Sequence, residues 1–231
     1  MSEPGSKRGR THDAEGAREA ILNAGEQVFA EHGFDGTRID AIAKVAGYNK
    51  SLIFQYFGDK LGLYAEVIRR ADDQTREMQN AALAGFNSEG AISPEQIRAL
   101  LMKFVGWYFD YLVAHPQIMR IYNWELAEGW QTFSKIVSQR DFDDIDQFGA
   151  VLVKVQGARL LRSDLNPIVQ WTPAIFTSLT FLGMLPLFRI LMPGVDVSSP
   201  AALASAREFF IEFISHGLFR EPLEVGQPSA V

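Results

Sequence analysis

Four polar side chains near residue 50 carry hydrogen-bonding groups of the kind that read DNA. They are Lys50, Ser51, Gln55 and Tyr56, and the stretch 41–58 around them holds two lysines and no acidic residue. In the major groove a lysine can donate to guanine, and a glutamine can bond an adenine at two atoms. The residue types therefore predict contact with a nucleic acid, provided that one helix presents them together.

The segment around these side chains has the spacing of two helices joined by a tight turn. Ala43 supplies the small residue needed where the second helix crosses the first, and Ile53 supplies a branched apolar residue that locks it in place. Gly47 tolerates the left-handed backbone of the turn because it has no Cβ atom. Asn49 can cap the second helix through its side-chain oxygen. We predict a helix-turn-helix, although a glycine turn in an ordinary helical hairpin is the alternative.

Apolar residues recur every three or four positions along the chain, as one buried helix face requires. Such stripes run over residues 21–29, 97–112, 142–152 and 203–214. No Asn-Gly or Asp-Gly hairpin turn separates alternating runs, and no period of 20–50 residues repeats. The pattern predicts an all-α protein of about nine helices.

Composition excludes several classes of site. The 231 residues include no cysteine, which excludes disulfides, thiolate zinc sites, iron–sulfur clusters and cysteine nucleophiles. The net charge of −6 argues against a nucleic-acid partner only if the charge is evenly spread. Residues 1–70 carry ten basic and ten acidic side chains, and residues 71–231 carry twelve and eighteen, so the whole excess lies in the second part.

The stretch Arg18–Ile68 resembles the TetR family of one-component transcriptional regulators. It has the family's order of an apolar helix, Phe-x-x-x-Gly-Phe, Thr, Ile-Ala-x-x-Ala-Gly and aromatic-Phe-x-x-Lys, over 51 of the 231 residues. A second, shorter segment, 115–129, is similar to part of some family effector domains. The resemblance implies a homodimeric repressor with an N-terminal three-helix helix-turn-helix domain and a larger helical domain for ligand binding and dimerisation. The expected divisions are a disordered basic tail over 1–16, the DNA-binding domain over 17–70, the ligand and dimer domain over 71–222, and a tail over 223–231.

The resemblance also implies which residues contact double-stranded DNA. They are Thr37, Arg38, Asn49, Lys50, Ser51, Gln55, Tyr56 and Lys60. Thr37 and Lys60 would hold phosphates, and Tyr56 would donate its hydroxyl to the DNA backbone. Departures from the family pattern include Ser51 in place of a glycine, and Phe54 in place of a tyrosine that could bond a phosphate. The operator sequence therefore does not follow from the family.

The second part of the chain supplies material for a ligand pocket and a dimer interface. Four residues combine an aromatic ring with a polar tip that could orient a ligand: Tyr108, Tyr111, Trp124 and Trp171. They predict a small, largely apolar or aromatic effector. We expect the homodimer to form through two antiparallel helices, 174–191 and 201–219, because their apolar surface exceeds what one buried face needs.

Parts of the sequence also fit other classes of protein. The uncharged run 165–188 is long enough for a membrane span, but prolines and polar residues favour a core or interface helix. The first sixteen residues contain no apolar segment typical of a secretory signal, so we expect a cytoplasmic protein. No P-loop, GxGxxG or HExxH motif occurs, so we expect no enzyme, no cofactor and no metal. Glu208, Glu212 and His216 share a helix face and leave a metal-dependent helical enzyme as a minor alternative. A helical small-molecule-binding or membrane-associated protein without a DNA role is the other alternative.

Overall fold

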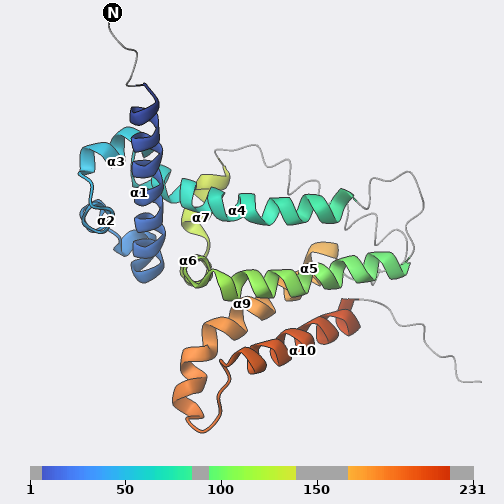
Figure 1. Cartoon of the computed structure of the whole chain (residues 1–231). Coiled ribbons are helices and arrows are strands. Elements are labelled where there is room, and N and C mark those ends of the chain that lie inside the picture. Colours follow the sequence, from blue (N-terminus) through green and yellow to red (C-terminus); the bar gives the residue numbers. More distant parts are fainter. Residues whose placement is uncertain (1–6, 85–93, 139–165, 219–231) are drawn as a thin grey trace, which may run out of the picture. The chain divides into compact units, whose positions relative to one another are not determined.

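The computed structural model describes residues 7–84, 94–138 and 166–218, in which nine helices and no strand are found (Figure 1). The helices are α1 (Lys7–Gly36), α2 (Ile39–Ala46), α3 (Lys50–Phe57), α4 (Lys60–Ala84), α5 (Pro94–Ala114), α6 (Pro116–Ala127), α7 (Gln131–Val137), α9 (Pro167–Leu191) and α10 (Pro200–Leu218). The predicted all-α class is confirmed. The helix predicted over 142–152 lies outside the described residues.

The chain folds into two compact units whose limits differ from the predicted domains. The N-terminal unit comprises residues 1–80 and 114–141, and the C-terminal unit comprises residues 81–113 and 142–231. Helix α4 runs through residue 70, the predicted domain boundary, without a break. Helix α1 already begins at Lys7, so residues 7–16 are helical where an irregular tail was expected.

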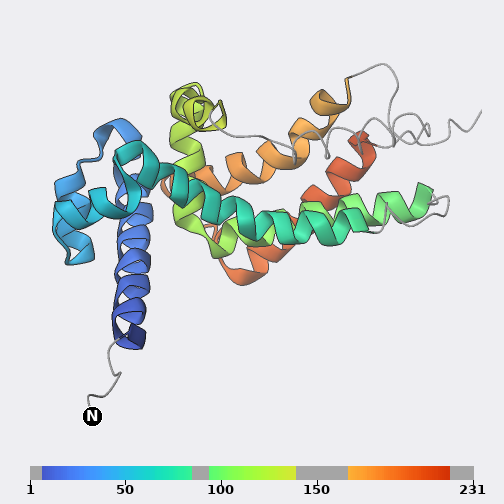
Figure 2. The same cartoon turned by 90° about the horizontal axis from the view of Figure 1, so that it is seen from above.

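In the N-terminal unit, α1 packs against α2 and α6, and both views show α2 and α3 beside α1 (Figure 1, Figure 2). The stripe predicted over 21–29 is buried, as its helical spacing requires. Three aromatic rings form the centre of this core. The ring centroid of Tyr64 lies 4.8 Å from that of Phe29 and 5.1 Å from that of Phe34. The core therefore joins the first helix to α4, which follows the two helices of the predicted motif.

Helix α1 is interrupted at Gly33, where the chain also approaches α6. The backbone at Gly33 has φ 67° and ψ −179°, a conformation that is open essentially to glycine alone. A Cβ atom there would lie 3.0 Å from Cδ2 of Trp124. The Trp124 indole N–H donates to the carbonyl oxygen of Ala30 at 3.3 Å. Gly33 thus turns the chain and makes room for a tryptophan that lies 91 positions further along the chain.

The C-terminal unit contains α5, α9 and α10, of which α9 and α10 pack together. Phe109 on α5, Phe181 on α9 and Phe210 on α10 meet with ring centroids 5.2 to 6.4 Å apart. Phe213, which the helical spacing placed inward, is 57% exposed. Within the described residues, one helix segment, Val169–Leu191, is long and apolar enough to cross a membrane, with a mean hydropathy of 1.7.

Candidate nucleic-acid interface

The turn between α2 and α3 is closed by Gly47, as the sequence predicted. Its backbone is left-handed, with φ 73° and ψ 19°, and its N–H donates to the carbonyl oxygen of Ala43. The N–H of Tyr48 donates to the same oxygen at 3.2 Å. A residue with a Cβ atom is strained in this conformation, so the turn depends on glycine.

Helix α3 is capped and locked by the two residues expected to do so. The Leu52 N–H donates to the Asn49 side-chain oxygen at 2.9 Å, so Asn49 is the N-cap. Ile53 on α3 and Ile42 on α2 are fully buried. The start and the rotation of α3 are therefore fixed by local contacts.

The same rotation leaves polar side chains on the outer face of α3. Lys50, Ser51 and Gln55 are all exposed, whereas Ile53 and Phe57 face the interior. These three side chains offer an ammonium, a hydroxyl and an amide along one short helix, which are suitable groups for hydrogen bonds to base edges and phosphates. The structure thus brings together the three residues predicted to approach bases.

Lys50 has an acidic neighbour that the sequence interpretation overlooked. Its ammonium forms an ion pair with the carboxylate of Asp40 on α2, and both side chains are largely exposed. Exposed pairs of this kind contribute at most about 1 kcal/mol. A phosphate or a guanine could therefore replace Asp40 as the partner of Lys50 at small cost.

Thr37 and Lys60 hold the connection between α1 and α2. Thr37 is 2% exposed and its hydroxyl proton is directed to the carbonyl oxygen of Gly33 at 2.7 Å. Its N–H donates to the carbonyl oxygen of Phe34, so both donors of Thr37 have partners inside the chain, and its predicted phosphate contact stays a prediction. Lys60 donates to the carbonyl oxygens of Phe34 (2.9 Å) and Thr37 (3.1 Å), with its ammonium over the Phe34 ring. A lysine has three donors, so one remains for the predicted phosphate contact.

The remaining two predicted DNA residues differ in exposure. Arg38 is exposed at the N-cap position of α2, where its side chain makes no capping bond. Tyr56 is half-buried and lines a hollow of about 410 Å³ together with Arg18, Gly62 and Glu66, among others. Arg38 is therefore accessible to a phosphate. Tyr56 lies at the edge of the exposed face of α3 that carries Lys50, Ser51 and Gln55, rather than on that face.

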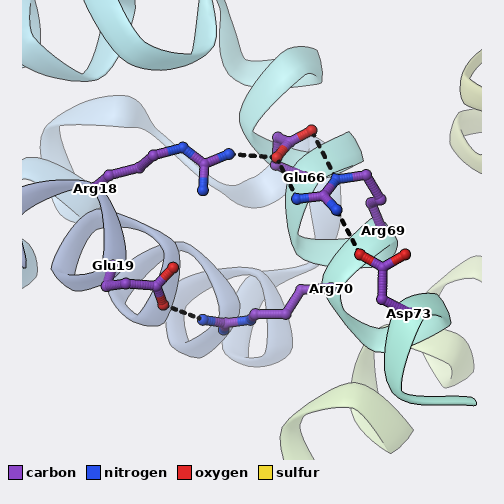
Figure 3. A network of polar contacts seen from close by, with 6 residues as sticks. All are labelled: Arg18, Glu19, Glu66, Arg69, Arg70 and Asp73. Carbon is purple, nitrogen blue, oxygen red and sulfur yellow. Dashed lines mark hydrogen bonds and ion pairs between the residues drawn. The ribbon is translucent and has the colours of Figure 1, made fainter. Parts of the chain in front are cut away.

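A network of ion pairs joins α1 to α4 (Figure 3). Glu66 accepts hydrogen bonds from Arg18 on α1 and from Arg69 on its own helix. The Arg69 hydrogen bond, more than any other cause, lowers the pKa of the Glu66 carboxyl below its ordinary value. Arg70 forms a second bridge, to Glu19 and Glu26 on α1. The residues paired between α1 and α4 lie 44 to 51 positions apart in the sequence, so no local sequence pattern predicts these ion pairs.

Comparison with known proteins matches this part of the chain to a family. The family model described as "Bacterial regulatory proteins, tetR family" matches residues 21–67, which run from α1 through the turn and α3 into α4. These N-terminal helices belong to the TetR family. This match confirms the resemblance inferred from the motif order. It includes α3, the helix that exposes Lys50, Ser51 and Gln55.

The relatives that this chain matches include transcriptional repressors. It is 33% identical over 116 residues to the HTH-type transcriptional repressor SCO4008 of Streptomyces coelicolor, covering 50% of this chain and 53% of that protein. It is 34% identical over 112 residues to the HTH-type transcriptional repressor NicS of Pseudomonas putida, covering 48% and 49%. The chain thus matches about half the length of these curated relatives. A crystal structure of a TetR family transcription regulator from Marinobacter aquaeolei has the same fold, with a TM-score of 0.65 and 20% identity over 92% of this chain and 100% of that chain.

The four predicted ligand residues fall in different units of the chain. Tyr108 and Tyr111 on α5 and Trp171 on α9 are buried in the C-terminal unit, where the Tyr108 ring stacks on Phe104 and the Trp171 ring lies tilted beside it. Burial, followed by the neighbouring Tyr111, raises the pKa of the Tyr108 hydroxyl, so it stays protonated. Trp124 instead packs on α1 in the N-terminal unit. Its contact with α1 is a packing role that the sequence did not reveal.

A buried carboxylate in the N-terminal unit also escaped the sequence analysis. Glu125 on α6 is 1% exposed and accepts the Tyr64 hydroxyl at 2.6 Å and the Phe133 N–H at 3.1 Å. It therefore links α4, α6 and α7. The glutamate considered as a metal ligand, Glu212, has its carbonyl oxygen 2.8 Å from Nδ1 of His216. In the described part of the chain, no cluster of three or more histidine or acidic side chains could hold a metal.

Proposed function

We propose that this chain is a ligand-responsive transcriptional regulator that binds double-stranded DNA through α3 and acts as a repressor. One observation carries the proposal: a capped, locked helix keeps Lys50, Ser51 and Gln55 exposed along one face. A helix of this width fits the major groove, where these groups can bond base edges. The family match and the names of the two relatives support repression.

The proposed regulator is a cytoplasmic homodimer that joins through α9 and α10, at residues 174–191 and 201–219. Supporting this interface, several large apolar side chains on these helices are exposed in the single chain: Leu187 at 44%, Ile190 at 75%, Leu191 at 65%, Phe209 at 59% and Phe213 at 57%. Large apolar side chains exposed on two packed helices support an interaction site there. Two recognition helices in one dimer would enter successive major grooves about 34–36 Å apart, which requires a near-palindromic operator.

Light scattering coupled to gel filtration tests this interface. We expect the wild-type chain to elute as a dimer of the 25.8 kDa subunit. Phe209→Glu combined with Phe213→Glu should yield a monomer, since two buried charges per subunit oppose association. A monomeric wild-type protein at micromolar concentration would exclude the proposed dimer.

The effector proposed for the C-terminal unit is a small, largely apolar or aromatic molecule. The aromatic rings of α5 and α9 support this class: the ring centroid of Phe104 lies 5.4 Å from that of Trp171 and 6.3 Å from that of Tyr108. Such an effector would release DNA by binding more tightly to a dimer in which the recognition helices have a different separation. Tyr111 and Trp171 supply polar tips that could orient it.

Gel retardation with DNA from upstream of the chain's own coding region tests DNA binding. We expect a specific complex that weakens steeply as salt rises, because phosphate contacts release counterions. Lys50→Ala should weaken it, whereas Lys103→Ala, which removes an exposed charge from the C-terminal unit, should not. No retardation at low salt would instead favour a helical ligand-binding or membrane-associated protein. Adding aromatic compounds to the same assay then tests the effector class.

A further inference from the structure

The recognition helix exposes one large apolar side chain among its polar ones. Phe54 keeps 45% of its surface exposed, whereas Ile53 and Phe57 of the same helix are 0% and 8% exposed. Residues three and four positions apart share a helix face, so Phe54 lies beside Lys50 and Ser51, which are both exposed. The ring therefore lies in the middle of the surface that the proposed function assigns to base contacts.

The chemistry of a phenyl ring limits what it can recognise there. It has no hydrogen-bond donor or acceptor, so it neither holds a phosphate oxygen nor reads the polar pattern of a base edge. It can only cover apolar surface. In the major groove of unmodified DNA, the C5-methyl group of thymine is the apolar group that a base edge presents.

We propose that Phe54 reads thymine, with its ring packed against the C5-methyl group of one thymine in each half of the operator. This inference rests on the proposed DNA-binding function and adds a specificity-determining residue to it. The polar neighbours Lys50 and Ser51 hold the helix on phosphates and on polar base edges, while Phe54 distinguishes thymine from cytosine at one position. Since the dimer presents α3 twice, the preference appears once in each half-site.

The test begins by identifying the bound sequence. The full-length chain is used to select sites from a randomised, unmethylated synthetic duplex library, so that thymine is the only source of a C5-methyl group. We expect a near-palindromic site with thymine at one fixed position in each half. Replacing that thymine by deoxyuridine removes the methyl group and keeps every hydrogen-bonding atom of the base. The loss of one buried methyl should weaken binding about fourfold per half-site, and about fifteenfold for both.

Variants assign this loss to one side chain. Phe54→Ala should bind the thymine and deoxyuridine duplexes equally, and Phe54→Ser is a second ring-free variant. Gln55→Ala is the matched control on the same exposed face, and it should keep the full thymine preference even if its affinity falls. Because Phe54 is nearly half exposed, these changes leave the buried contacts of Ile53 intact, and circular dichroism verifies that the helices remain.

Two results would overturn the inference while leaving the proposed function in place. One is a selected site with no fixed thymine. The other is a deoxyuridine effect that persists at full size in both ring-free Phe54 variants. If no sequence is selected above the non-specific background, the proposed DNA-binding function itself fails, and the inference fails with it.

Discussion

Removing the hydroxyl of Tyr64 should lower the free energy of unfolding by about 2 kcal/mol. Tyr64 on α4 is 1% exposed, and its hydroxyl donates to Oε1 of the equally buried Glu125 at 2.6 Å. Burial, and then the hydrogen bond and charge of Glu125, raise the pKa of Tyr64 above its ordinary value. The phenol therefore keeps its proton and remains a donor at neutral pH.

The magnitude follows from what the substitution Tyr64→Phe removes and what it leaves. The ring keeps its edge-on contacts with Phe29 and Phe34, so little packing is lost. A hydrogen bond to a charged group contributes about 1.5–3 kcal/mol, and the short distance between hydroxyl and carboxylate places this bond among the stronger ones. The buried carboxylate of Glu125 would retain the Phe133 N–H as a donor.

Urea unfolding of the full-length chain measures this loss, with all variants at one subunit concentration because association shifts apparent stability. The set comprises Tyr64→Phe, Glu125→Gln and the double variant, with Tyr56→Phe as a control at a half-buried tyrosine of the same unit. We expect the two single losses to be non-additive, because the partners share one bond, and the control to change little. If Tyr64→Phe unfolds at the wild-type urea concentration, the reasoning from burial and distance is refuted.

Three further substitutions test the contacts that stabilise the helices around the helix-turn-helix. Gly33→Ala should destabilise the chain by about 2 kcal/mol in thermal or urea unfolding, since its backbone region is closed to alanine, whereas Gly36→Ala, with ordinary space for a Cβ atom, should not. Asn49→Ala should cost about 1 kcal/mol by loss of the cap, and Asn49→Ser should restore most of it; equal stabilities would contradict the capping role. The folded pKa of Glu66 is lowered, so its stabilisation is complete above its ordinary value of 4.5 and is lost as the pH falls through the folded pKa. The destabilisation by Glu66→Gln should therefore shrink in acid, and a pH-independent difference would argue against the ion pairs.

The helix-turn-helix could be predicted from the sequence because its determinants are local. Gly47, Asn49 and Ile53 act within a few residues of the turn, and each has a residue type that its backbone or packing position demands. The same short range fixes which side chains of α3 point outward. Local spacing also predicted the helices, but it did not decide which apolar side chains of α10 are covered within one subunit: Phe210 is 8% exposed and Phe213 is 57% exposed.

Long-range partners could not be predicted in the same way. Thr37 was assigned a phosphate contact from its place in the motif, but the turn at Gly33 draws its hydroxyl inward to a backbone carbonyl. Asp40 was overlooked as a partner of Lys50, since the two face each other only when the turn brings α2 and α3 together. Each of these depends on the three-dimensional path of the backbone rather than on neighbouring residue types.

The sequence by itself determined the helical class, the position of helix α3 and the family of the N-terminal helices, because periodicity, turn chemistry and motif order act over short stretches of chain. Only the tertiary structure decided that residues 114–141 belong with the N-terminal unit. There Trp124 fills the space left by Gly33, and Glu125 receives the hydroxyl of Tyr64. These partners are separated by 91 and 61 positions, and close packing selects them by shape and hydrogen bonding, neither of which leaves a periodic trace in the sequence.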